Sequence, residues 1–240
     1  MRAATRTALL APPDGPAMDE ALCFDMYGTL CDTSSVTATL ADELDAADGL
    51  VDAVDARWRA TQLRYSFLLV GMGRYRPFWD VTADALDYAL DYYELDPDEE
   101  TRERILASYN HLEPFDDALD ALADLHEAGY ELAVLSNGSP PMLETLAANA
   151  GFEPILDAVV SAHEVETFKP APAVYENAAA RLDRDLAACR LVSSNAWDVA
   201  GAAAAGMGTA WVNRSREPSA RVGGAADLMA STLVALAEEL

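Results

Sequence analysis

The chain has 240 residues, a hydrophobic fraction of 51% and a formal net charge of -25 at pH 7. This length allows one large hydrophobic core, alone or with a small added domain, and excludes three independent domains. A surface of this charge repels nucleic acids and anionic membranes, so we expect neither as a partner. The apolar runs are far shorter than the roughly 18 residues that cross a bilayer, so we expect no membrane segment.

The N-terminal segment makes a poor signal peptide. Arg2 and Arg6 precede a short apolar patch at residues 8–11, but two prolines and an acidic residue follow this patch at once. We therefore predict an N-terminal tail over residues 1–19, to which we assign no function, and a cytoplasmic protein. The acidic residues are spread along the chain, and Lys169 is its only lysine. Such surfaces are typical of proteins from salt-loving microbes, where high ionic strength screens the self-repulsion.

The three cysteines, Cys23, Cys31 and Cys189, are odd in number and form no Cys-x-x-Cys motif. We predict buried, reduced thiols, in preference to a disulfide framework or a metal site. The three histidines also lack metal-ligand spacing, so we expect capping or surface roles for them.

The first strand signal is the apolar run at residues 21–24. It ends at Asp25, where the turn-forming sequence Tyr27-Gly28-Thr29 follows. Open α/β sheets place their ligands at such carboxyl ends of strands. The pattern is then helical from about residue 36 to residue 110. We expect four amphipathic helices there, near residues 37–45, 51–70, 79–93 and 98–109.

Strands and helices alternate after Pro114. Apolar runs predict strands at residues 132–135, 155–160, 190–193 and 209–212. Helical segments begin at residues 140, 171, 196 and 230. Strands separated by helices are typical of a parallel sheet that is covered on both faces. We therefore predict an α/β fold with a Rossmann-like parallel sheet, a core of residues 20–35 and 112–240, and an inserted helical cap of residues 36–111.

Four polar clusters follow predicted strands, at residues 25–29, 136–139, 169–170 and 193–198. The carboxyl ends of parallel strands share one edge of a sheet, so we expect these clusters to converge there. Each cluster alone is more often a turn or a helix cap, because aspartate, serine, asparagine and glycine favour such structures. The four together, in this order and with the only lysine among them, indicate an active site.

These clusters resemble those of the haloacid dehalogenase superfamily, and within it of the L-2-haloacid dehalogenases, and the likeness extends from Phe24 onward. The matching motifs are Asp25-Met26-Tyr27-Gly28-Thr29, Ser136-Asn137-Gly138, Lys169-Pro170 with Tyr175 six residues after the lysine, and Ser193-Ser194-Asn195-Ala196-Trp197-Asp198. The predicted cap matches at Trp58-Arg59, Gln62-Leu63, Tyr65, Arg74-Tyr75 and Phe78. Phosphatases of the superfamily carry a second aspartate two residues after the nucleophile, where this chain has Tyr27.

The resemblance implies a hydrolase that acts on short L-2-haloacids and needs neither a metal nor another cofactor. Asp25 would displace the halide in an SN2 step, and hydrolysis of the resulting ester would give a D-2-hydroxy acid. The partner would be this small haloacid. A homodimer fits the family. The long helix predicted at residues 51–70 offers an apolar face, which either forms the dimer contact or packs against the other helices of the cap.

The resemblance also implies roles for the residues beside Asp25. Lys169 would keep Asp25 ionised, as an opposite charge at short range does. Tyr175 would orient Lys169 or the substrate carboxylate. Asp198, in the same cluster as Ser193, would activate the water that attacks the ester.

A second group of matched residues would contact the substrate. Thr29, Ser136 and the amides around Asn137 would hold its carboxylate. Arg59, from the cap, would stabilise the departing halide with help from Asn195. An apolar wall would exclude water from the nucleophile; its residues would be Tyr27, Leu63, Phe78 and Trp197.

Plainer interpretations stay open for some of these residues. Trp58 and Trp197 could be core aromatics, and for Trp58 we expect this. Other arginines lie near Arg59 in the sequence, so its role depends on the family match. The family often has glutamine directly after this arginine, where this chain has Ala60, a change that would widen the pocket or weaken the halide contact.

Two other functions compete with dehalogenation. The first is a magnesium-dependent phosphatase, in which Asp25 attacks phosphorus and Asp198 helps to bind the metal. Tyr27 argues against it, because a phenol replaces the carboxylate that serves as general acid. The second is a binding protein that keeps the fold without catalysis. A silent protein has no physical need for an ionised aspartate opposite the only lysine, nor for a spare carboxylate at position 198.

Overall fold

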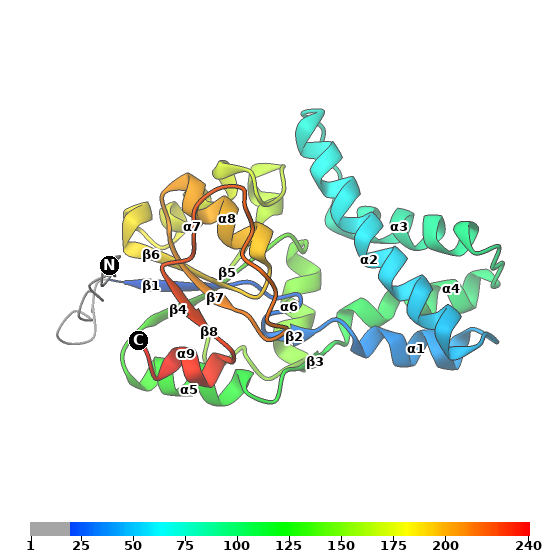
Figure 1. Cartoon of the computed structure of the whole chain (residues 1–240), viewed down its shortest axis with the longest axis horizontal. Helices are drawn as coiled ribbons and strands as arrows, with labels where there is room; N and C mark the ends of the chain where they lie inside the picture. The colour runs from blue at the N-terminus through cyan, green and yellow to red at the C-terminus, as the bar shows by residue number, and fades with distance from the viewer. Residues whose placement is uncertain (1–19) are drawn as a thin grey trace, which may run out of the picture.

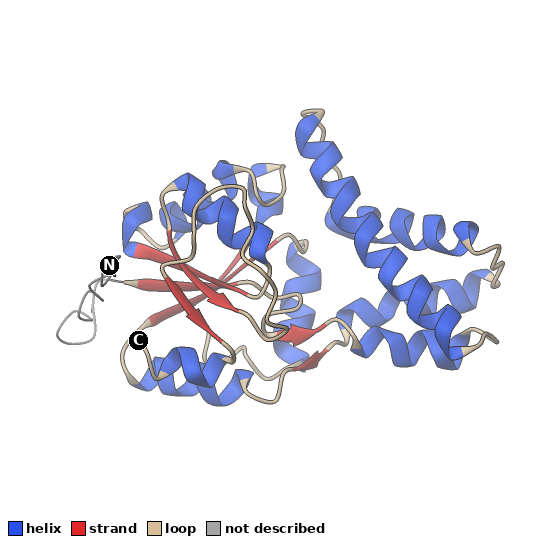
Figure 2. Ribbon diagram, viewed as in Figure 1, coloured by secondary structure: helices blue, strands red, loops and turns tan. Residues whose placement is uncertain are grey.

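One parallel sheet forms the centre of the lobe that contains both ends of the described chain, and a block of helices lies beside this lobe (Figures 1 and 2). The computed structural model describes residues 20–240, and the predicted tail at residues 1–19 lies outside them. Within the described residues, six strands pair in parallel in the order β5-β4-β1-β6-β7-β8. They are β1 (Ala21–Phe24), β4 (Glu131–Ser136), β5 (Ala158–Ser161), β6 (Cys189–Ser193), β7 (Gly208–Val212) and β8 (Leu228–Ala230). The predicted α/β class and parallel sheet are confirmed.

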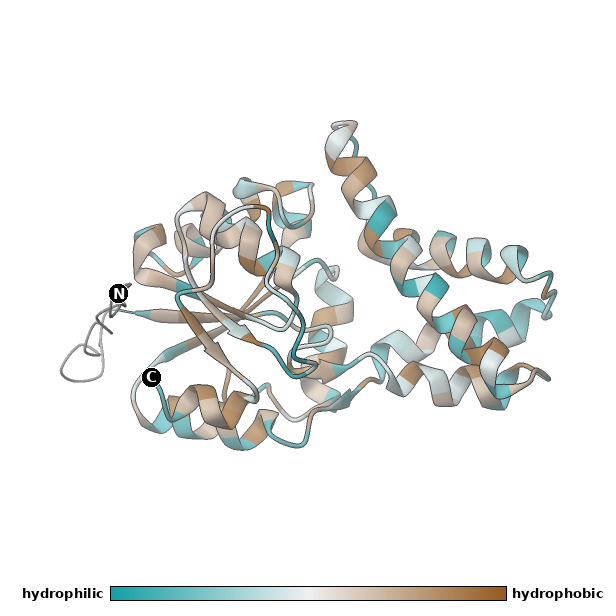
Figure 3. Ribbon diagram, viewed as in Figure 1, coloured by the Kyte–Doolittle hydropathy of each residue, from teal (hydrophilic) through white to brown (hydrophobic). Residues whose placement is uncertain are grey.

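Helices cover both faces of this sheet (Figure 2). One face packs against α5 (Ala118–Glu127), α6 (Pro140–Asn149) and α9 (Leu233–Ala237), and the other against α7 (Pro172–Arg181) and α8 (Ala196–Ala205). Successive side chains of β1 alternate between the two layers: Leu22 and Phe24 join the first apolar cluster, while Ala21 and Cys23 join the second. Because both layers are buried, the strand has no polar face (Figure 3).

The helical block predicted after the first strand lies to one side of the sheet (Figure 1). It consists of α1 (Ser35–Glu43), α2 (Asp48–Gly71), α3 (Phe78–Tyr92) and α4 (Glu99–Ala107). The chain enters and leaves this block through a two-stranded antiparallel ribbon of β2 (Cys31–Asp32) and β3 (Glu113–Pro114). The division into domains at residues 36 and 111 stays a prediction. Between residues 20 and 240, no helix is long and apolar enough to span a membrane.

Some predicted elements are corrected by the structure. The helix expected from residue 230 begins at Leu233, because Ala230 ends β8 and the side chain of Thr232 caps the helix by accepting a hydrogen bond from the backbone N–H of Ala235. The strand expected from residue 155 begins at Ala158. The ribbon strands and β8 were not predicted. Strands of two or three residues have no periodic pattern, and pairing between distant segments defines them.

Trp58 joins α2 to α3 and is the core aromatic that the sequence predicts. Its side chain is buried, its Nε1–H donates to the carbonyl oxygen of Thr82 at 2.8 Å, and its ring lies 4.8 Å from that of Tyr109. These contacts fix α2, which carries Arg59, against the neighbouring helices.

We expect Trp58→Ala to lower the free energy of unfolding by about 3–5 kcal/mol, because it removes a large buried ring and leaves a cavity. Urea denaturation followed by circular dichroism measures this. Trp79→Ala is the matched control, since Trp79 is only partly buried and its removal should cost less. Equal losses for the two variants would contradict the role of Trp58.

Candidate active site

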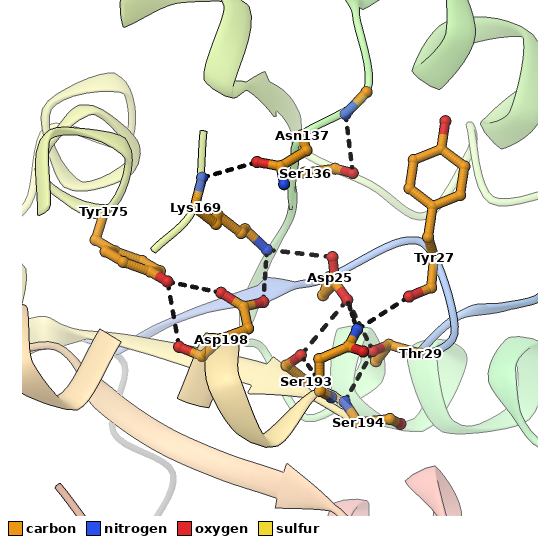
Figure 4. Close-up of polar contacts among 12 residues, drawn as sticks. Asp25, Tyr27, Thr29, Ser136, Asn137, Lys169, Tyr175, Ser193, Ser194 and Asp198 are labelled. Carbon is orange, nitrogen blue, oxygen red and sulfur yellow. Dashed lines mark hydrogen bonds and ion pairs between the residues drawn. The ribbon is translucent and has the colours of Figure 1, made fainter. Parts of the chain in front are cut away.

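Polar residues of three adjacent strands meet at the carboxyl edge of the sheet (Figure 4). Asp25 follows β1, Ser136 ends β4 and Ser193 ends β6, and β1 lies between the other two strands. Lys169 comes from the loop before α7, and Asn195 is the N-cap residue of α8. The convergence predicted from the four clusters is therefore present.

Asp25 is a buried carboxylate, 5% exposed, with donors on both oxygens. Oδ1 lies 3.2 Å from Nζ of Lys169. Oδ2 accepts hydrogen bonds from Thr29 Oγ1 at 3.2 Å, Asn195 Nδ2 at 2.8 Å and Ser193 Oγ at 3.4 Å. The turn after β1 makes the Thr29 contact, and Gly28 gives this turn its left-handed residue, with φ of 80°. These contacts fix the orientation of the carboxylate.

Thr29 and Asn195 each make a second hydrogen bond besides the one to Asp25. The hydroxyl of Thr29 donates to Asp25 and accepts from the backbone N–H of Ser194 at 2.8 Å. The amide of Asn195 donates to Asp25 and, at 3.1 Å, to the carbonyl oxygen of Tyr27. Both groups are thus committed to the nucleophile and its turn. This corrects the expectation that Thr29 holds the substrate carboxylate and that Asn195 helps to bind the halide.

Lys169 bridges two buried carboxylates. Its Nζ lies 2.8 Å from Asp198 Oδ2 as well as 3.2 Å from Asp25 Oδ1, and its own side chain is fully buried. Burial by itself lowers the pKa of Lys169, but the charges of Asp198 and Asp25 outweigh it and raise this pKa above its ordinary value. The backbone N–H of Lys169 donates to Oδ1 of Asn137 at 2.8 Å, which anchors the loop. The lysine therefore stays charged between its two partners.

Asp198 is completed by Tyr175. The phenol donates to Asp198 Oδ1 at 2.7 Å, so each oxygen of this carboxylate has a donor. Tyr175 thus holds Asp198, which corrects the expectation that it contacts Lys169 or the substrate. Burial raises the pKa of Asp198, the charge of Lys169 opposes this and that of Asp25 adds to it. A raised pKa makes Asp198 a better proton acceptor.

A cavity of about 110 Å³ opens in front of Asp25, at the edge of the sheet that faces α2 and α3. Most of the predicted site residues line it; they are Asp25, Tyr27, Arg59, Leu63, Phe78, Ser136, Asn137, Asn195 and Trp197. The others lie beside or behind Asp25, outside this lining; they are Thr29, Lys169, Tyr175, Ser193 and Asp198. The rings of Tyr27 and Phe78 are 5.9 Å apart, and Trp197 is braced by Phe67 at 5.3 Å. The apolar part of the wall is therefore mostly aromatic.

Arg59 is the cation of the cavity wall. Its Nη2 pairs with Asp55 one helical turn earlier, and its Nη1 donates to the hydroxyl of Thr33 at 2.9 Å. Ala60 is exposed and does not line the cavity, and its expected effect on the pocket or the halide contact stays a prediction.

The comparisons with known proteins agree with this geometry. The family model for haloacid dehalogenase-like hydrolases matches residues 20–206. The chain belongs to this family. It is 43% identical over 206 residues to an (S)-2-haloacid dehalogenase of Xanthobacter autotrophicus, an alignment that covers 85% of this chain and 79% of that protein. It is 37% identical over 198 residues to (S)-2-haloacid dehalogenase 1 of Pseudomonas sp. strain CBS-3, covering 82% of this chain and 86% of that one.

Solved structures show the same relationship. The L-2-haloacid dehalogenase from Xanthobacter autotrophicus with chloropropionic acid covalently bound superposes with a TM-score of 0.84 and is 35% identical. The superposition covers 91% of this chain and 97% of that chain. The family resemblance that the motifs predict is confirmed.

The two carboxylates at the strand edge of this haloacid dehalogenase-like hydrolase are paired with a lysine. They share the ammonium of Lys169, which occupies the position between them. No group of three His, Cys, Asp or Glu side chains in residues 20–240 is arranged to hold a metal ion. The three cysteines are free and buried, as predicted.

Sequence reasoning missed four residues of the cavity lining in this hydrolase, which are Gly28, Thr33, Gln62 and Tyr109. Gly28 and Gln62 lie inside the matched motifs, where they could have been chosen. Thr33 and Tyr109 lie in no motif. Tyr109 follows α4 in a short 3-10 helix, and only the packing of that helix against Trp58 and Tyr27 places its ring at the cavity.

Proposed function

We propose that this hydrolase converts short L-2-haloacids to D-2-hydroxy acids and halide through an ester on Asp25. The observation that carries the proposal is a buried carboxylate with donors on both oxygens, which is paired to a lysine and faces a small cavity whose apolar part is mostly aromatic. A carboxylate in such a place attacks carbon well, because the walls exclude water and the donors fix its direction. The names of the relatives, (S)-2-haloacid dehalogenases, support the same reaction.

In the first step an oxygen of Asp25 attacks the carbon that bears the halogen. The new C–O bond forms as the carbon–halogen bond breaks, the halogen leaves with the bonding electrons, and the carbon is inverted. Ser136 and Asn137 line the cavity, and we assign Ser136 and the amides around Asn137 to the substrate carboxylate. Arg59 is assigned to the departing halide, because Asn195 already spends its donors on Asp25 and Tyr27.

In the second step water attacks the carbonyl carbon of the Asp25 ester. Asp198 takes one proton of this water as its oxygen adds to the carbonyl carbon. The C–O bond to the substrate then breaks, the proton of the added hydroxyl passes to the departing alkoxide, and the 2-hydroxy acid leaves. Asp25 is again a carboxylate, and Asp198 releases its proton to solvent. The raised pKa of Asp198 favours this proton transfer. Lys169 remains in contact with Asp198 while the charge on Asp25 is lost and regained.

The magnesium-dependent phosphatase has less support. Its general acid would stand at position 27, where the phenol of Tyr27 lies against Phe78 and Tyr109 and burial raises its pKa. A phenol with a raised pKa is a poor acid for a leaving alkoxide.

We expect the protein to release chloride from L-2-chloropropionate in the presence of EDTA, and to form D-lactate. Potassium glutamate supplies ionic strength without chloride. Asp25→Asn should reduce the rate to background, since the amide cannot displace the halide, and a circular dichroism spectrum should show the variant folded. Hydrolysis of a phosphate ester only with magnesium, and no chloride release, would contradict the proposal.

Lys169→Ala should stop turnover and leave the fold intact. Loss of the ammonium leaves two buried carboxylates without their shared cation, which costs about 3–5 kcal/mol. A domain with about 5–15 kcal/mol of stability remains folded after such a loss. Chloride release measures the turnover of the variant, and urea denaturation measures its stability. The surface substitution Arg181→Ala is the control for both. A fully active Lys169→Ala variant would refute the assigned role.

We also propose a homodimer formed through the C-terminal half of α2. Leu68, near the end of α2, and Met72, the residue directly after this helix, are 51% and 62% exposed. The two positions are four residues apart and share one face, so their side chains form an exposed apolar patch that favours association. Light scattering should give twice the chain mass for the wild type and the chain mass for Leu68→Glu/Met72→Glu. A wild type of single chain mass at micromolar concentration would contradict the dimer.

A cytoplasmic location and a high-salt environment stay predictions of the sequence. The net charge of -25 and the single lysine support the second. The free energy of unfolding, measured at increasing concentrations of potassium glutamate, tests the high-salt prediction. It should rise with salt, because salt screens the repulsion between the acidic side chains.

A further inference from the structure

We propose that Asp55 is a positioning residue that acts on the leaving halide through Arg59. This inference rests on the proposed dehalogenation, which assigns Arg59 to the halide. Asp55 lies one helical turn before Arg59 on α2 and is 3% exposed. Its Oδ2 accepts hydrogen bonds from Nη2 of Arg59 and, at 3.2 Å, from the hydroxyl of Thr37. Its Oδ1 has no partner among the described residues.

Asp55 holds one end of the Arg59 guanidinium, and Thr33 holds the other. Nη1 of Arg59 donates to the Thr33 hydroxyl at 2.9 Å, and Thr33 itself lines the cavity. A guanidinium is planar and carries five N–H donors. Two fixed contacts set its plane and leave the remaining donors for the cavity. The position of the cation at the wall is thus determined by Asp55 together with Thr33.

Helix stability does not account for a charge at this place. A buried carboxylate with an unpaired oxygen is destabilising, and an apolar side chain of similar size would pack this face of α2 more favourably. Burial is also the main cause of the raised pKa of Asp55, ahead of the opposing charge of Arg59. The one strong favourable contact of Asp55 is the one that it makes with Arg59.

The charge of Asp55 also limits how tightly Arg59 binds an anion. A negative charge in contact with the guanidinium reduces the positive potential that Arg59 projects into the cavity. The halide is stabilised as it leaves, but it is held weakly enough to depart. Asp55→Asn keeps the size of the side chain and an oxygen acceptor for Arg59, and it removes only this charge.

Bromide binding measures this effect without turnover. We expect calorimetric titration in potassium glutamate to show bromide bound on the order of tenfold more tightly by Asp55→Asn than by the wild type. Asp52→Asn is the matched control, because Asp52 is an exposed acid on the same helix and its removal should leave bromide affinity unchanged. Absence of chloride release by the wild type would contradict the proposed dehalogenation but not the effect of Asp55 on bromide binding. Equal bromide affinity of wild type and Asp55→Asn, or no binding by either, would overturn the role of Asp55.

A double-mutant cycle tests whether Asp55 acts through Arg59. In an Arg59→Ala background, Asp55→Asn should have no further effect on bromide affinity. In the background of the native arginine, the inhibition constant for product chloride should fall on the order of tenfold, while Asp55→Glu should restore the wild-type value. A change in thermal stability without a change in bromide affinity would make Asp55 structural only. An equal tightening with and without Arg59 would also refute the proposal.

Discussion

The site depends on one ammonium group shared between two buried carboxylates. Taking three ionised groups out of water costs several kcal/mol for each ion, and mutual attraction offsets this only where hydrogen bonds complete the arrangement. Here every carboxylate oxygen has a donor. Lys169 contacts both Asp25 and Asp198, the three donors around Oδ2 complete Asp25, and Tyr175 completes Asp198. The cluster carries one net negative charge, which is the charge that the nucleophile uses.

The sheet topology brings these groups within hydrogen-bond distance, because the ends of β4, β1 and β6 lie side by side. The backbone N–H of Asp25 donates to the carbonyl oxygen of Val192 at 2.9 Å, so the end of β1 is fixed beside the end of β6. Close packing of α8 against α7 brings Tyr175 to Asp198, and Gly201 permits it. A Cβ atom on Gly201 would lie 2.6 Å from the Tyr175 hydroxyl and 2.4 Å from Cβ of Pro170, the residue after Lys169. A larger side chain there would displace both the tyrosine and the lysine loop.

The sequence predicts that the polar residues lie at the strand ends, but it does not predict which hydrogen-bond partner each side chain has. The four clusters, the sole lysine and the strand that ends at Asp25 all follow from local pattern and motif. The commitment of Thr29 and Asn195 to Asp25 does not, because side-chain torsions and the turn between them decide which acceptor each donor meets. Tyr109 could not be predicted from any motif, since its place in the wall comes from the packing of Trp58 between distant helices. Pairing of β2 with β3 likewise depends on residues about eighty positions apart.

The charges of the cavity also explain why a strongly acidic protein can handle an anionic substrate. The first step of the proposed reaction starts with two anions, the Asp25 carboxylate and the haloacid. It ends with two anions as well, the substrate carboxylate, now attached to Asp25 through an uncharged ester bond, and the free halide. The total charge of the site therefore does not change in this step. The net field of the chain opposes the approach of the substrate and favours the departure of the halide. Binding must therefore come from short-range donors at the strand ends, where Ser136 and the amides near Asn137 lie, and from Arg59. Without a carboxylate beside it, Arg59 would bind both the substrate and the product halide tightly. Tight binding of the substrate helps turnover, whereas tight binding of the product halide, the second effect, slows its release. A carboxylate that contacts Arg59 from behind reduces the second effect while it keeps the guanidinium in place.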